Sequence, residues 1–113
     1  MINMKLWIDD VRPAPDGYEW CKSVNQAKKA IEWFLMIEWT VKGHNEPFED
    51  KIEIIDIDHD AGEFAADGGD YIKLLDWLEE TGRNYPIRIH SMNPVGVENM
   101  RRIIQKNGWT EVR

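Results

Sequence analysis

Five short runs of strand-forming residues punctuate the chain. Residues 4–8, 51–58 and 86–89 are rich in isoleucine, leucine and other apolar residues, and we expect each to be a strand of a buried sheet. Residues 18–22 are expected to form a further short strand, and residues 109–112 a last strand at the edge. The apolar pattern therefore predicts a sheet of five strands.

Three stretches between these strands carry apolar residues at helical spacing. The first begins at Ser23, which forms a capping-box pattern with Gln26, and ends between residues 36 and 43. The second covers about residues 71–82, and the third covers about residues 93–108. The faces expected to turn inward are those of Val24, Ala27, Ile31, Phe34, Leu35, Tyr71, Leu74, Leu75, Leu78, Val97, Met100 and Ile104.

The alternation of strands and helices predicts an α/β domain with a mostly parallel sheet. Residues 10–17, DVRPAPDG, contain two prolines and a glycine, so the first two strands are joined by a loop. Residues 43–50 and 61–69 are further predicted loops. At 113 residues the chain, 1–113, makes one domain. We expect helices on both faces of the sheet, in a three-layer α/β/α architecture.

Composition narrows the classes of function. The 14 Lys and Arg against 21 Asp and Glu give a net charge of −7, which disfavours an extended nucleic-acid surface. Cys21 is the single cysteine, so we expect neither a disulfide framework nor a cysteine zinc site. No apolar run approaches the roughly 20 residues of a membrane span, and the first ten residues do not resemble a signal peptide. We therefore expect a cytoplasmic protein without membrane contact, in an oligomeric state that the sequence leaves open.

Acidic side chains gather where two predicted strands end. Asp9 and Asp10 follow the first strand, and Asp58 and Asp60 follow the third. The carboxyl ends of parallel strands share one edge, where open α/β sheets place their sites. Crowded carboxylates suit a hard divalent cation, so Asp9, Asp10 and Asp58 predict a site for Mg²⁺ or Mn²⁺. Alternatively the acids only cap loops and solvate the edge. Asp56, two residues before Asp58, is expected to lie below the edge and support it.

Two histidines occupy the same edge. His59 lies between two of the acids, and His90 follows the fourth strand. Because histidine changes charge near neutral pH, two rings that face a common point can act as acid and base. The simpler interpretation is that each ring is a loop residue bonded to a backbone carbonyl. His44 stands in a polar loop and is expected to be solvated.

Anion-binding groups are predicted at the start of the third helix. Ser91 and Asn93 stand immediately before it, where free N–H groups and a partial positive charge attract anions. Asn93 and Gly96 could present a cradle for a phosphate oxygen, although an ordinary helix cap explains Asn93 equally well. Arg12, in the loop after the first strand, could clamp the same anion or only brace its turn.

The segments LWIDDVRPAP, DIDHDAGE and IHSMNPVGVENM occur in this order over nearly the whole chain. Together they resemble the cyclic-phosphate processing receiver domain family, a divergent branch of the response-regulator receiver fold. The resemblance implies a flavodoxin-like fold whose first helix is replaced by a loop. It also implies that Asp9 and Asp10 are the Mg²⁺ pair, Asp58 the phosphoacceptor position and Ser91 the receiver hydroxyl. The lysine of ordinary receivers has no counterpart in residues 109–113, which disfavours classical phosphoryl signalling.

Two functions follow from the site and the resemblance. The first is a metal-assisted phosphoesterase for a cyclic nucleotide or an RNA-end cyclic phosphate, with His59, His90, Asp58 and Asp60 as catalytic residues. The alternative is a receiver-like phosphoacceptor or ligand-binding module that uses Asp58 without turnover and gives the histidines no task. A third hypothesis is an interaction domain whose site has decayed.

Overall fold

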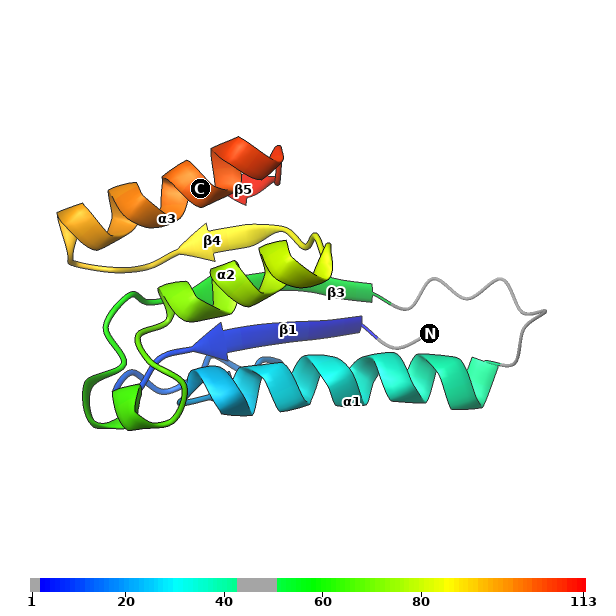
Figure 1. Cartoon of the computed structure of the whole chain (residues 1–113). Helices are drawn as coiled ribbons and strands as arrows, with labels where there is room; N and C mark the ends of the chain where they lie inside the picture. Colours follow the sequence, from blue (N-terminus) through cyan, green and yellow to red (C-terminus); the bar gives the residue numbers. More distant parts are fainter. Residues whose placement is uncertain (1–2, 43–50) are drawn as a thin grey trace.

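The computed structural model describes residues 3–42 and 51–113, and Figure 1 shows their arrangement. The predicted loop 43–50, with His44, lies outside the described residues. In chain order the elements are β1 (Asn3–Ile8), β2 (Glu19–Cys21), α1 (Val24–Lys42), β3 (Lys51–Ile57), the 3₁₀ helix η1 (Gly62–Ala66), α2 (Ile72–Thr81), β4 (Ile87–Ile89), α3 (Pro94–Asn107) and β5 (Glu111–Val112).

The five strands form one parallel sheet in the order β2-β1-β3-β4-β5. This is the predicted α/β fold, and its strand order is that of flavodoxin-like proteins. The residues 10–17 that join β1 to β2 form no helix, as the sequence indicated. In the register of the sheet Trp7 lies beside Asp56, and Asp56 lies beside Arg88. Since neighbouring residues of paired strands share a face, these three side chains share one face of the sheet.

All three helices lie on the other face (Figure 1), where α1 contacts α2 and α2 contacts α3. The expectation of helices on both faces is therefore wrong. The connections from β2 to β3, β3 to β4 and β4 to β5 step across the sheet in one direction, and right-handed crossovers in one direction place their helices on one face. The step from β1 to β2 runs in the opposite direction, and this is the step that has a loop in place of a helix.

The main core lies between the sheet and the three helices. The strands contribute fully buried aliphatic side chains that include Leu6, Ile8, Ile55, Ile57 and Ile87. The predicted inward stripes of all three helices meet them, with two exceptions to full burial. Leu35 packs against this core while partly buried, and Val97 is half-buried outside it. No helix among residues 3–42 and 51–113 is long and apolar enough to cross a membrane.

The helix-free face has a small cover of its own. Trp7 is buried there, although it belongs to no part of the main core. Its indole Nε1 donates a 2.8 Å hydrogen bond to the carbonyl of Arg12, and the ring of Tyr18 packs edge-on at 6.1 Å between centroids. The loop between β1 and β2 thus folds back over the face that a first helix would otherwise cover.

The start of α1 is tied to the segment after η1. One half of the predicted capping box is confirmed, because Ser23 Oγ accepts from the N–H of Gln26 at 3.0 Å. Gln26 Oε1 accepts from the N–H of Lys22 in place of that of Ser23. Ser23 Oγ also donates to Asp67 at 2.6 Å, and the Asn25 amide donates to the same carboxylate. These bonds fix the position of η1 beneath the carboxyl edge of the sheet.

Candidate functional site

Three carboxylates meet at the carboxyl edge of the sheet. Asp9 and Asp10 follow β1, and Asp58 follows β3, whose chain is joined to β1 by the Asp58 N–H bond to the Ile8 carbonyl at 2.9 Å. One carboxylate oxygen from each acid lies within 4.8 Å of those of the other two. Asp9 is buried and the other two are half-buried. The structure therefore brings together the three acids predicted from the sequence.

The donor set of this acidic cluster fits a hard divalent cation. Three oxygens so close together repel one another, and a cation among them would offset that repulsion. The Asp10 carboxylate lies directly against the backbone of Gly62, where an added Cβ would overlap Oδ2 of Asp10. Gly62 also has a φ of +54°. Glycine is thus required here both by the left-handed backbone and by the close approach of the Asp10 carboxylate.

His90 is held between two buried carboxylates. Its Nε2 lies 2.9 Å from Oδ2 of Asp9, and its Nδ1 lies 2.6 Å from Oδ1 of Asp56. The ring stacks on Trp7, with 3.9 Å between centroids and 6° between planes. Arg88 extends the chain of bonds, since its Nη1 donates to Oδ2 of Asp56 at 3.0 Å.

This network corrects the role expected of Asp56. The hydrogen-bond partners of its carboxylate are His90 and Arg88, so the expectation that it supports Asp58 is wrong. The reason is the register of the sheet, which sets Asp56 beside Arg88 of β4, so that the guanidinium of Arg88 and the ring of His90 reach its carboxylate.

The environment of His90 favours its protonated form. Burial alone would lower the pKa of His90, but the hydrogen bonds and charges of Asp56 and Asp9 outweigh burial and raise it above its ordinary 6.5. Burial alone would raise the pKa of Asp9, yet the backbone N–H groups of Val11 and Arg12, together with His90, lower it below 3.8. Both ring nitrogens lie within hydrogen-bond distance of carboxylates, which only accept, so the protonated ring can donate to both.

His59 belongs to a second polar group at the start of α3. Its Nδ1 lies 2.8 Å from Oδ1 of Asp60 and 3.5 Å from the amide of Asn93. Its ring packs so closely on Gly96 that a Cβ there would overlap it, and its backbone N–H donates to Asp58 at 2.8 Å. Among the described residues no partner contacts its Nε2. The structure thus gives the two histidines different hydrogen-bond partners.

The predicted anion-binding residues line the approach to α3. Asn93 caps the helix, because its Oδ1 accepts from the N–H of Gly96 at 3.0 Å, and Ser91 Oγ accepts from the N–H of Asn93 at 3.1 Å. Arg12 donates from Nη1 to the carbonyl of His90 at 3.2 Å. The guanidinium of Arg12 therefore lies against the segment that carries Ser91.

One feature of the sequence could have indicated part of the His90 network, namely the two-residue spacing of its members along β1 and β4. Trp7 and Asp9 are two residues apart, as are Arg88 and His90, so each pair shares a face of the sheet. The register that sets Asp56 between them could not be read from the sequence, because the pairing of β1 with β3 shifts at the irregularity between residues 4 and 5.

The model of one family, described as the cyclic-phosphate processing receiver domain, matches residues 4–106 of the 113-residue chain. The chain belongs to this family. No curated protein and no solved structure matches it. The resemblance seen in the three sequence segments is therefore confirmed, and the acidic cluster lies at the edge of the sheet where a receiver domain carries its site.

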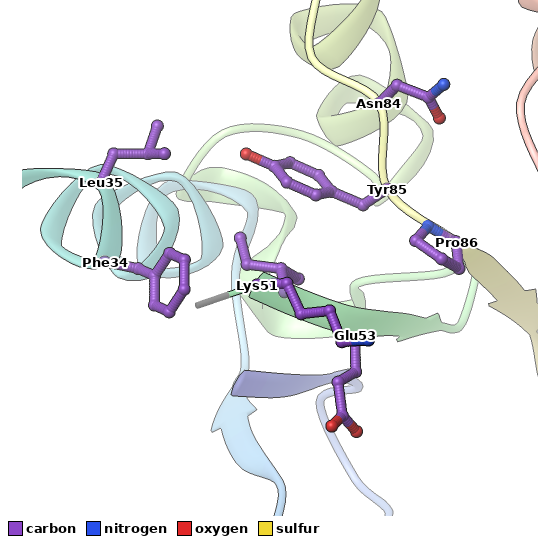
Figure 2. Close-up of a pocket in the computed structure, with 8 residues that line it drawn as sticks. Phe34, Leu35, Lys51, Glu53, Asn84, Tyr85 and Pro86 are labelled. Atoms are coloured by element: carbon purple, nitrogen blue, oxygen red, sulfur yellow. The ribbon is translucent and has the colours of Figure 1, made fainter. Parts of the chain in front are cut away.

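Two cavities of this receiver domain lie away from the acids. One, of about 520 Å³, lies at the amino end of β3, where Figure 2 shows Phe34 and Leu35 of α1 opposite Tyr85 and Pro86. The other, of about 460 Å³, lies between α1 and β2. Neither cavity is lined by a predicted site residue, so the candidate site is the sheet edge itself.

Substitution at Gly62 tests the acidic cluster. We expect Gly62→Ala to displace the Asp10 carboxylate and to weaken Mn²⁺ binding about tenfold or more, measured by calorimetric titration. Gly17→Ala is the matched control, because Gly17 also has a positive φ of 85° but has nothing within 4 Å of an added Cβ. Equal Mn²⁺ affinity in the two variants would contradict the placement of Asp10 in the cluster.

The pH dependence of stability tests the charge on His90. Because its folded pKa is raised, His90 stabilises the protein most below its ordinary pKa of 6.5, and this contribution is lost as pH rises through the folded value. We expect the free energy of unfolding in urea to fall over that window in the wild type and to fall less in His90→Gln. The same slope in both proteins would show that His90 is not held as a cation.

Proposed function

We propose that this domain hydrolyses a cyclic phosphate ester, such as a cyclic nucleotide or an RNA-end cyclic phosphate, at the carboxyl edge of its sheet. The observation that carries the proposal is the cluster of Asp9, Asp10 and Asp58, whose oxygens lie within 4.8 Å of one another beside the His59 and Asp60 pair. Membership of the cyclic-phosphate processing receiver domain family supports the choice of substrate.

Asp9, Asp10 and Asp58 would hold the cation, which we propose to be Mg²⁺ or Mn²⁺. When bound, the cation would polarise a phosphoryl oxygen and offset charge that develops on it. His90 serves the cluster as a positioning residue in place of the proton transfer expected from the sequence. It fixes Oδ2 of Asp9, while the N–H groups of Val11 and Arg12 fix Oδ1, so that this carboxylate has one orientation.

Proton transfer is assigned to His59. With Nδ1 donating to Asp60, the tautomer of His59 leaves a lone pair on Nε2. Nε2 would take a proton from water as the water oxygen bonds to phosphorus, and would return it to the ester oxygen as that P–O bond of the ring breaks. The product is an open phosphate monoester, and the Asp60 carboxylate stabilises the imidazolium between the two transfers.

The remaining phosphate oxygens would be received at the start of α3. Pro94 has no N–H, and the N–H of Gly96 donates to Asn93. The groups that would receive them are therefore the N–H of Val95, the partial positive charge of the helix start and the Ser91 hydroxyl. The guanidinium of Arg12 approaches from the opposite loop, where its bond to the His90 carbonyl leaves other donors for an anion. The polar groups for the phosphate and for the proton thus come from different elements at one edge.

Substitution of His59 tests whether the ring acts in proton transfer without contributing to cation binding. We expect His59→Gln to lower kcat for a cyclic phosphate about 10²- to 10⁴-fold, as loss of a general acid and base does. Mn²⁺ affinity should stay within about twofold, because His59 donates to the cluster only through its backbone N–H. Release of monoester is measured with Mg²⁺ or Mn²⁺ present. Absence of turnover by the wild type across a panel of cyclic phosphates would refute the proposal.

A receiver-like phosphoacceptor without turnover is the second candidate, favoured by the position of Asp58 beside Asp9 and Asp10. One oxygen of Asp58 accepts the His59 N–H, which orients the carboxylate for attack on a phosphoryl donor. Incubation with a small phosphodonor and Mg²⁺, followed by intact mass, tests it. A stable adduct that Asp58→Asn abolishes, without release of monoester, would favour this function over hydrolysis.

A further inference from the structure

Three exposed apolar side chains lie on the two segments that carry the site. Val11 is 73% exposed, Met92 is 84% exposed and Val95 is 69% exposed. In the part of the chain that the structure describes, the other exposed large apolar side chains are Trp33 and Met36, both in α1. We call Val11, Met92 and Val95 the apolar rim.

Hydrogen bonds of the site join the two loops that carry Val11 and Met92. Arg12 Nη1 donates to the His90 carbonyl at 3.2 Å and so joins the loop after β1 to the loop after β4. Val11 immediately precedes Arg12, and its N–H donates to Asp9 at 2.9 Å. Met92 follows His90 by two residues. The apolar rim therefore has one member on each side of this bond.

The third member borders the proton-transfer group. Val95 lies in the first turn of α3, next to Gly96, on which the ring of His59 packs. A phosphate between the acidic cluster and the start of α3 would thus lie beside segments that carry exposed apolar side chains. The charged and polar groups of the site would bind the phosphate. The uncharged organic part of the ester needs apolar contacts, which these groups do not supply.

We infer that the apolar rim binds the organic group of the ester, and that this group is an aromatic ring of the size of a nucleobase, with Met92 as its main contact. The inference rests on the proposed function and specifies its substrate. A methionine side chain is flexible and polarisable, so it packs well against an aromatic face. Three side chains are too few for a stable protein interface, which needs roughly 800 Å² per partner, and this favours a small group as the occupant.

Two substrates with the same cyclic phosphate test this inference. A nucleoside 2′,3′-cyclic phosphate carries a base, and glycerol 1,2-cyclic phosphate does not. We expect Met92→Gln to lower the ratio of kcat/KM for the nucleoside ester to kcat/KM for the glycerol ester about three- to tenfold. The replacement removes apolar contact with the base, and the loss is comparable to that of burying one or two fewer methylene groups. Met36→Gln is the matched control, because Met36 is also an exposed methionine but lies in α1, and it should leave the ratio unchanged.

Direct binding separates this inference from the proposed hydrolysis. Calorimetric titration with a nucleoside 3′-monophosphate and with glycerol phosphate, in the presence of Mn²⁺, needs no turnover. Weaker nucleotide binding in Met92→Gln, without hydrolysis by the wild type, would support the inference and refute the hydrolysis. If both proteins hydrolyse the esters and Met92→Gln leaves the ratio of the two kcat/KM values unchanged, the inference alone is overturned. This is the result expected if the apolar rim binds a protein. Absence of both binding and turnover would overturn both.

Discussion

The structure depends on one imidazolium that compensates two buried carboxylates. A buried carboxylate is costly unless a positive charge and hydrogen bonds accompany it. His90 meets this requirement for Asp9 and Asp56 together, with one ring nitrogen for each, and Trp7 covers its face. Because Asp9 follows β1, Asp56 lies in β3 and His90 follows β4, the ring also joins three strands. Loss of the ring would leave two buried acids uncompensated at the edge that carries the site.

The His90 network in turn depends on the connection between β1 and β2. A helix at this step would cover the face that holds Trp7 and Asp56, and the backbone carbonyls of that helix would be engaged within it. The loop instead gives the Arg12 carbonyl to the Trp7 indole and the Arg12 guanidinium to the His90 carbonyl. The same ten or so residues therefore cover the helix-free face and bring the guanidinium of Arg12 to the segment after β4.

Local rules were enough to predict the elements and much of the edge. The caps at Ser23 and Asn93 are local hydrogen-bonding patterns, so the starts of α1 and α3 could be read directly from the sequence. The meeting of Asp9 with Asp58 needed only that two parallel strands end at the same edge. The partner of His90 depended on register and on which face of β3 Asp56 occupies. Those are properties of the assembled sheet, and a one-residue shift reverses them.

The two histidines show why residue type and sequence position could not assign a role. Both follow strands at one edge, which suggested one shared task. His90 has both ring nitrogens bonded to buried acids, so it is a donor only and its charge is structural. His59 has one nitrogen bonded to Asp60, which is 61% exposed, and this leaves its other nitrogen for a proton. Environment gives two identical side chains different hydrogen-bond partners, as it gives paired carboxylates different protonation in other active sites. An acid and base pair at this edge is therefore best sought in His59 and a solvent or substrate oxygen.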